Sequence, residues 1–143
     1  MVVVARLESI TALTALVGAR IYNQVVPESP RYPLVRVAFI DDDVPYHLRG
    51  PVGTKAARVQ VDARARDESG ADKKQTALNV MAAIEGDGLG RQATGLSGWI
   101  GSVGSPPFKV KGVFPQSRRD DYDPEELRVV TVSRDFIVHF RDA

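Results

Sequence analysis

The chain has 143 residues, 43% of them hydrophobic and 26% charged, which excludes a disordered chain and predicts one globular domain over residues 1–143. Its 19 basic and 18 acidic side chains leave a formal charge of +1, too small for a general attraction to nucleic acid or an anionic membrane. The absence of cysteine excludes disulfides, thiolate metal sites and cysteine nucleophiles. Residues 1–5 lack the features of a secretory signal, and no apolar run reaches the roughly 18 residues of a membrane span, so we expect synthesis in the cytoplasm and no membrane partner.

An amphipathic helix is predicted near the N-terminus, because apolar residues recur there at spacings of three and four. Ser9 or Thr11 is expected to divide this helix into two pieces, and Gly18 is suited to cap its C-terminus. The apolar positions are Leu7, Ile10, Leu13, Leu16 and Val17. An extended loop is predicted to follow, since the backbone is restricted at Pro27, Pro30 and Pro33.

Two strands are predicted next. In residues 34–40 every side chain except that of Arg36 is apolar, which predicts a strand internal to a sheet and covered on both faces over part of its length. The second strand alternates strictly, so we expect its apolar side to pack and its polar side to face water. The apolar side carries Ala57, Val59, Val61 and Ala63, and the polar side carries Arg58, Gln60, Asp62 and Arg64.

A second helix and a glycine-rich loop are predicted after these strands. Ser69 and Asp72 resemble a capping box, and the helix that they begin presents one apolar face and ends near Gly86. That face carries Leu78, Met81 and Ile84. Seven glycines then fall between Gly86 and Gly104, a density that disfavours regular structure and predicts a long loop or flexible excursion over about 86–107.

Two further strands are predicted toward the C-terminus. In the first, Phe108, Val110 and Phe114 are expected on one side and Lys109 and Lys111 on the other, before a polar stretch over residues 118–126. The last strand places its apolar side chains at alternate positions, and Arg134 interrupts them. A bulge or a paired arginine would explain this interruption. The apolar positions are Val130, Val132, Phe136, Val138 and Phe140.

The order helix, strand, strand, helix, strand, strand predicts an α+β fold. Consecutive strands can join as antiparallel neighbours, and both helices are free to pack on one face of the sheet. The predicted architecture is a two-layer sandwich with a mostly antiparallel sheet.

Motifs for catalysis and cofactor binding fail at particular residues. The phosphate-loop spacing from Gly90 to Gly95 is followed by Leu96 instead of lysine, and Arg91 occupies the third glycine position of a dinucleotide-binding pattern. The run from Gly95 to Gly98 lacks one spacer of a nucleophile elbow. With only two histidines, His47 and His139, a two-histidine metal site is a weak alternative. We therefore predict no catalytic residues, no cofactor, no bound metal and no enzymatic activity.

Charged clusters remain as candidate interaction sites. Each has a simpler explanation, as a solvated turn or a solvated strand face, and a functional one, as a contact with a complementary surface on a neighbouring subunit. The second acidic cluster also lacks the glycine and the spacing of a calcium loop. The acidic clusters are Asp41, Asp42 and Asp43, and Asp120, Asp121, Asp123, Glu125 and Glu126; the basic stripe is Arg58, Arg64 and Arg66, with Arg36 beside it.

Several segments resemble, in order, the tail-completion proteins of tailed phages, also called tail terminators or tail-to-head joining proteins. Residues 13–22, LTALVGARIY, resemble the opening signature of that family, and residues 32–35, YPLV, resemble the start of its first long strand. Residues 48–51 with 57–62 resemble its next hairpin arm, and residues 122–136 resemble its last strand. The resemblance runs from about Leu7 to Phe140, and it departs from the family in the glycine-rich stretch at 86–107.

The resemblance implies a structural virion component in the neck region of the tail, belonging to a phage, a gene transfer agent or a tailocin. Such a subunit forms a homohexameric ring that caps the tail tube, ends tube polymerisation and joins the tail to a head-completion or connector protein, while DNA only passes through the lumen. The loops at 41–54 and 87–107 are expected to reach a neighbour, the tube or the lumen. Another neck or tail ring component, such as a head-closure protein or a tube subunit, is the alternative, and a small metal-dependent enzyme is a more distant one. The candidate residues for the subunit or tube interface are Asp41, Asp42, Asp43, Arg58, Arg64, Arg66, Trp99, Arg118, Arg119, Asp121 and Asp123.

Overall fold

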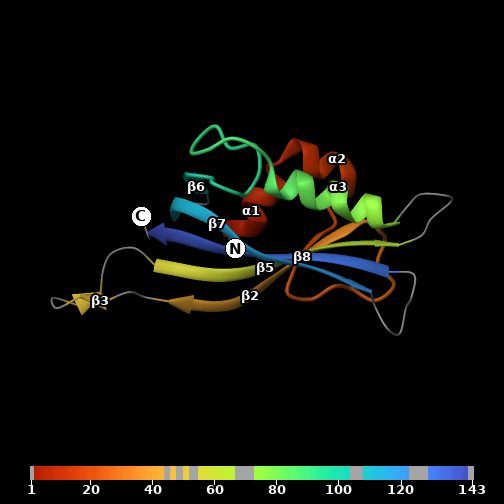
Figure 1. Cartoon of the computed structure of the whole chain (residues 1–143), viewed down its shortest axis with the longest axis horizontal. Coiled ribbons are helices and arrows are strands. Elements are labelled where there is room, and N and C mark those ends of the chain that lie inside the picture. The colour runs from red at the N-terminus through yellow and green to blue at the C-terminus, as the bar shows by residue number, and fades with distance from the viewer. Residues whose placement is uncertain are drawn as a thin grey trace.

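In the computed structural model, the described part of the chain forms a six-stranded sheet with three helices on one of its faces (Figure 1). The backbone is described for residues 2–43, 46–47, 50–51, 55–66, 73–103, 108–122 and 129–141, and the side chains for residues 3–40, 55–66, 73–102, 109–119 and 129–140. The helices are α1 (Val2–Glu8), α2 (Thr11–Val17) and α3 (Lys73–Glu85). The sheet contains β1 (Ile21–Asn23), β2 (Leu34–Asp43), β5 (Lys55–Arg66), β6 (Gly101–Val103), β7 (Phe108–Tyr122) and β8 (Val129–Arg141).

The strands follow the order β1-β2-β5-β8-β7-β6 across the sheet. Strand β1 runs parallel to β2, and all other neighbouring pairs are antiparallel. A separate two-stranded ribbon, β3 (Tyr46–His47) with β4 (Gly50–Pro51), lies beyond the end of β2 (Figure 1). The predicted α+β class and mostly antiparallel sheet are confirmed, and β1, β6 and this ribbon are additions that were not predicted.

The predicted N-terminal helix is divided, as expected, around Ser9. The Ser9 hydroxyl donates a hydrogen bond of 2.6 Å to the Arg6 carbonyl, which satisfies an acceptor at the end of α1. Ile10 is buried between the two helices, and Gly18 ends α2 with its N–H bonded to the Thr14 carbonyl. The proposed capping box at Ser69 and Asp72 lies outside the described residues, and α3 is described from Lys73.

The core lies between the helices and the two central strands. Strand β5 pairs with β8 in an unbroken register, and β2 is internal to the sheet with buried side chains on both faces, as predicted. The interruption of the last strand is explained by a paired arginine, because Arg134 Nη1 lies 2.8 Å from Glu85 Oε1 on α3. The helix contributes Ala77, Val80, Met81 and Ile84 to the core.

The predicted side of Phe114 is wrong, because β7 contains a register shift. Between Val110 and Gly112 one residue of β7 has no partner on β8, so the alternation changes phase there. Val110 is buried in the core, whereas Phe114 is 52% exposed and packs edge-on against His139 on the other face, with ring centroids 5.4 Å apart. The predicted polar stretch after residue 118 continues β7 as far as Tyr122.

The glycine-rich segment was expected to be a long loop or a flexible excursion. Residues 86–100 do form a loop of turns and bends, and this loop folds back onto the core. Ala93, Leu96 and Trp99 are buried, and the Leu96 N–H donates a hydrogen bond of 2.7 Å to the Ile84 carbonyl near the end of α3. Residues 101–103 form β6 against β7. The glycines therefore allow tight turns and close backbone contacts here, and three apolar side chains anchor the segment.

Candidate functional site

The face of the sheet opposite the helices carries the predicted basic stripe. Val59, Val61, Ala63 and Ala65 of β5 point into the core. The alternate positions, which include Arg58, Arg64 and Arg66, therefore point the other way. Cross-strand register then brings Arg36 of β2 beside Asp62, and Arg119 of β7 beside Ser133 of β8. A polar cluster results, called here the open-face network, which consists of Arg36, Arg58, Gln60, Asp62, Arg64, Arg119, Ser133 and Asp135.

Asp62 is the centre of one half of this network. Its side chain was predicted to face water, but the residue is only 2% exposed, so that prediction is wrong. Oδ1 accepts hydrogen bonds from Ser133 Oγ at 2.6 Å and from Gln60 Nε2 at 2.9 Å. Oδ2 lies 3.3 Å from Arg36 Nη1 and 3.6 Å from Arg64 Nη2. The flanking side chains therefore exclude water and replace it as partners of the carboxylate.

Asp135 is the centre of the other half. Its Oδ2 accepts hydrogen bonds from Arg58 Nη2 at 2.7 Å and Nε at 3.2 Å. Oδ1 is buried and accepts no hydrogen bond in the described part of the chain, and Arg119 Nη2 lies 3.6 Å from it, too far for one. Arg119 Nη2 also donates to Gln60 Oε1 at 2.9 Å, which links the two halves across three strands.

Charge is not balanced within the network, where four guanidinium groups surround two carboxylates. The two aspartates hold the arginines in place, while the side chains of Arg58 and Arg119 stay 48% and 55% exposed. An exposed arginine that is already fixed loses little conformational entropy when it binds an anionic group. This face can therefore offer oriented cations to an acidic surface.

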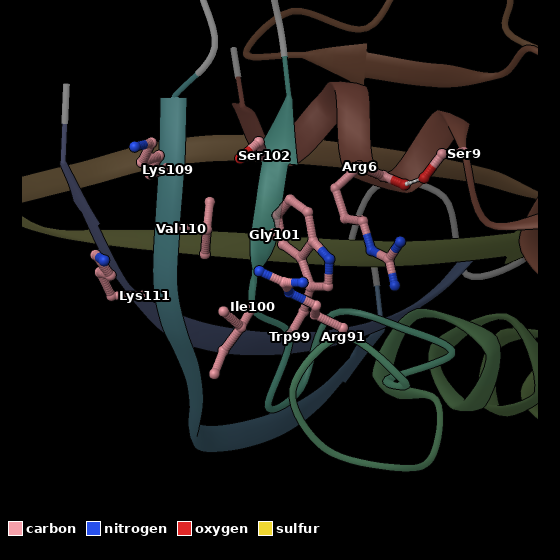
Figure 2. A pocket seen from close by; sticks show the side chains of 10 residues that line it. All are labelled: Arg6, Ser9, Arg91, Trp99, Ile100, Gly101, Ser102, Lys109, Val110 and Lys111. Carbon is pink, nitrogen blue, oxygen red and sulfur yellow. Dashed lines mark hydrogen bonds between the residues drawn. The ribbon is translucent and has the colours of Figure 1, made fainter. Parts of the chain in front are cut away.

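A second basic feature is a pocket of about 640 Å³ beside β6 and β7 (Figure 2). Among the ten described residues that line it, four are cationic and none is acidic. Arg6 lies at one side of the pocket, and its guanidinium carbon is 4.7 Å from the centre of the Trp99 ring. Arg91 extends in front of Trp99, and Lys109 and Lys111 extend from β7 (Figure 2).

Arg6 is held by the glycine-rich segment. Nη2 donates hydrogen bonds to the Ala93 carbonyl at 2.7 Å and the Gly95 carbonyl at 3.0 Å, and Nε donates a longer one to Gly95. No carboxylate pairs with it among the described residues, and partial burial lowers the pKa of Arg6 from its ordinary value because the charged form loses hydration. Arg6 thus acts as a clamp between α1 and the segment.

The structure places the predicted interface residues in three kinds of environment. Arg58, Arg64 and Arg119 belong to the open-face network, and Arg118 and Arg66 lie at exposed and half-buried positions of β7 and β5. Trp99 is in the core with 5% of its surface exposed, so its indole supports the fold of the chain and offers little surface to a partner. The backbones of Asp41, Asp42, Asp43 and Asp121 lie in strands while their side chains are outside the described residues, as is all of Asp123.

Sequence reasoning missed Gln60, Asp62, Ser133 and Asp135 as members of a network. The available signal was that β5 and β8 both place polar residues at alternate positions, which matched positions on adjacent strands bring together. Among the described residues there is no group of three potential metal-binding side chains. Every described helix also falls short of the length and apolarity that crossing a membrane requires.

The fold and this face define an α+β domain whose sheet is packed by helices on one side and carries a polar network on the other. The model of the family described as tail completion protein gp17 matches residues 1–139, so the chain belongs to that family. Membership makes the protein a structural component of a virion tail. No curated protein sequence matches the chain.

A solved structure supports the fold. A chain from the virion of a native gene transfer agent particle is similar to this one with a TM-score of 0.57 and 17% identity. The match covers 98% of this chain and 92% of the other. At this identity the likeness shows a shared fold over nearly the whole length of both chains.

Proposed function

We propose that the protein forms a hexameric ring that caps the tail tube, ends tube polymerisation and joins the tail to the head-completion or connector protein. The observation that carries the proposal is the family match over residues 1–139. The fold shared with a chain of a gene transfer agent virion is consistent with it. The role is assembly, without catalysis, and DNA passes through the lumen of the ring.

The open-face network and the acidic clusters supply part of the contacts in this proposal. Arg58 and Arg119 are exposed and oriented, and they suit carboxylates of the neighbouring subunit or of the tube. The acidic segments around Asp41 and Asp121, with Asp123, are the complementary candidates. In a ring, each subunit contacts its two neighbours through two different lateral surfaces. This head-to-tail contact closes the ring only when the rotation between subunits permits it.

Electron microscopy of the purified protein, alone and with tail tubes, tests the proposal. A terminator gives single rings and six-fold caps at tube ends, whereas a tube subunit gives stacked rings of growing length. Without the protein, tubes should assemble to uncontrolled lengths, and when it is added they should stop at the normal length. This pair of results would support the capping role. Caps absent from tubes at saturating protein would overturn it.

Charge reversal separates the role of the open face from that of the ring. Arg64→Glu reverses a half-buried charge beside Asp62, and Arg119→Glu reverses an exposed one. We expect Arg119→Glu to weaken ring formation or tube capping while the fold is retained. An unchanged oligomeric state and unchanged tube binding in both variants would remove this face from the interface.

A further inference from the structure

The two sides of the sheet end in strands that are only partly covered. On one side, β1 pairs with β2 at Val35, Arg36 and Val37, and the Gln24 N–H donates to the Val37 carbonyl. From Ala38 to Asp43, β2 is the outermost described strand. This segment is called the β2 edge.

On the other side, β6 pairs with β7 only from Phe108 to Val110. The Gly98 N–H donates a hydrogen bond of 2.8 Å to the Val113 carbonyl, which covers one more acceptor. Beyond that point β7 is the outermost described strand as far as Tyr122, and this segment is called the β7 edge. The parts of β2 and β7 that are covered lie at opposite ends of the sheet.

Outer strands of this length are sites where another chain can pair, and proteins normally protect them. Here the protection is incomplete and local. Each edge contains a register shift, between Phe39 and Asp41 on β2 and between Pro115 and Arg118 on β7. Phe39 and Ile40 are nonetheless 44% and 50% exposed, and Phe114 is 52% exposed.

Pro115 is compatible with an outer strand, because its missing N–H does not remove a hydrogen bond between β7 and β8. The Val113 carbonyl points away from β8, since it bonds to Gly98, and backbone groups two residues apart in a strand point the same way. The missing N–H of Pro115 therefore faces outward, where it removes one donor and excludes partners that need it. The shifts and this proline disfavour indiscriminate pairing, but a partner with a matching edge can still pair.

We propose that the β2 edge of one copy pairs with the β7 edge of the next copy, so that the sheets continue from subunit to subunit; this inference rests on the proposed ring. Strands β2, β5, β8 and β7 are successively antiparallel, so β7 runs opposite to β2. A neighbour placed beside the sheet without inversion therefore presents its β7 antiparallel to β2. This is a head-to-tail contact between two different edges, as a closed ring requires.

Charge indicates the register of the pairing. The β2 edge ends in Asp41, Asp42 and Asp43, and the β7 edge contains Arg119. Opposite charges on directly facing residues stabilise a strand pair, and like charges destabilise it. An antiparallel register with Arg119 opposite Asp41 fits the faces of the two strands, because Asp41 pairs with Arg58 and Arg119 with Ser133, and both partners are on the open face. The same register places Arg118 opposite Asp42 and Ile40 opposite Asp120. Because the covered parts lie at opposite ends, this pairing shifts neighbouring copies along the strand direction, as the tilted strands of a closed barrel do.

Disulfide cross-linking tests the pairing in assembled tails. The natural chain has no cysteine, so the double variant Ile40→Cys, Asp120→Cys carries the only thiols. Directly opposed residues satisfy the Cα–Cα separation of roughly 4.4–6.8 Å that a disulfide needs. After mild oxidation we expect a ladder of covalent multimers on a denaturing gel without reductant, and its collapse to the monomer band when reductant is added.

The matched control is Ile40→Cys, Leu16→Cys. Leu16 is 41% exposed on α2, which lies in the helical layer on one face of the sheet (Figure 1). It should give monomer only, as should either single-cysteine variant. A ladder from the control as strong as that from the Asp120 pair would overturn the proposal.

The test separates this inference from the proposed function. Suppose that six-fold caps are present by microscopy and yet give no ladder, in the Asp120 variant and in matching variants at Gln116, Ser117 and Arg119. That result would overturn the edge pairing and leave the ring in place. Failure to cap tubes at all would overturn the proposed function and this inference with it. Hydrogen exchange gives a second measure, because amides of residues 38–40 and 116–119 should gain protection at least tenfold on assembly.

Discussion

Ser133 on β8 donates a hydrogen bond of 2.6 Å to Oδ1 of Asp62 on β5, and both side chains are buried on the sheet face opposite the three described helices. Parity brings the two residues to the same face, and the register of β5 with β8 places them directly opposite each other. The arginines that flank Asp62 then exclude water from the pair. The carboxylate therefore depends on protein partners for its stability.

Asp62→Asn should lower the free energy of unfolding by about 2 kcal/mol, because the variant keeps the volume but leaves Arg36 and Arg64 without a counter-ion. Ser133→Ala should cost about 1 kcal/mol, the usual value for one hydrogen bond. Urea denaturation followed by Trp99 fluorescence measures both. A smaller effect of Asp62→Asn than of Ser133→Ala would contradict the central role of the carboxylate.

Arg58 and Arg119 contact the same aspartate and form a matched pair of variants. Arg58 makes two hydrogen bonds to Asp135 Oδ2, so Arg58→Ala should destabilise the chain by about 1 to 2 kcal/mol. Arg119 approaches Oδ1 only to 3.6 Å and is more exposed, so Arg119→Ala should cost less than about 1 kcal/mol. Urea denaturation measures the free energy of unfolding of both variants. An equal decrease in the two would show that the difference in contact geometry does not affect stability.

Arg6 is expected to hold the glycine-rich segment by its geometry more than by its charge. Arg6→Lys keeps the positive charge but cannot span the Ala93 and Gly95 carbonyls with one planar group, and it should cost about 1 to 2 kcal/mol. Trp99 is the only tryptophan and lies under the guanidinium, so its emission maximum should shift in the native state. An unchanged spectrum with full stability would contradict the clamp.

Arg6 should contribute nothing to the pH dependence of stability near neutrality. Its pKa in the folded chain is lowered by burial, so the folded state binds the proton less tightly than the unfolded state does. Stability from this group therefore rises with pH only in the strongly alkaline range where arginine begins to lose its proton. Arg6→Lys and the natural chain should then show parallel stability profiles between about pH 6 and 8.

Arg134 and Glu85 join the last strand to α3 with an ion pair of 2.8 Å. Both side chains are about one quarter exposed, and Arg134 Nε is buried without a hydrogen bond in the described part of the chain. A double-mutant cycle with Arg134→Met and Glu85→Gln should give a coupling energy of about 1 kcal/mol. The double variant should be at least as stable as Glu85→Gln alone, since Arg134→Met then removes an unpaired cation.

Local patterns were sufficient for the central part of the fold. The alternation in β5 and β8 assigned side chains to faces correctly. Of the two explanations that the sequence left open for Arg134, a bulge or a pair, the structure shows the pair with Glu85. Alternation could not show that Asp62 is buried, because its cover comes from arginines on the same and a neighbouring strand. The burial of Asp62 therefore depends on the order and register of the strands, which the sequence of a single strand does not reveal.

The failures in β7 and the glycine-rich segment have different causes. One extra residue near Gly112 reverses the alternation, and nothing in the sequence marks the shift, so Phe114 was assigned to the wrong face. In the glycine-rich segment, the density of glycine indicates flexibility, whereas Leu96 and Trp99 indicate packing against the core. Those two apolar residues are what bury the segment, and the glycines make the close approach possible.

Gly86 and Gly90 allow this role of glycine to be tested with one substitution at two sites. Both have nearly the same positive φ, +66° and +65°, so replacement by alanine should carry a similar strain of about 1 to 2 kcal/mol at each. They differ in space, because a Cβ at Gly86 would collide with the backbone of Gly95, whereas at Gly90 it would meet only Ile100 Cδ1 at 4.0 Å. Gly90→Ala should therefore show the conformational cost alone, and Gly86→Ala should lose at least about 2 kcal/mol more, since the backbone must move. Urea denaturation of the two variants measures the difference, and equal losses would mean that the segment does not pack closely against the end of α3.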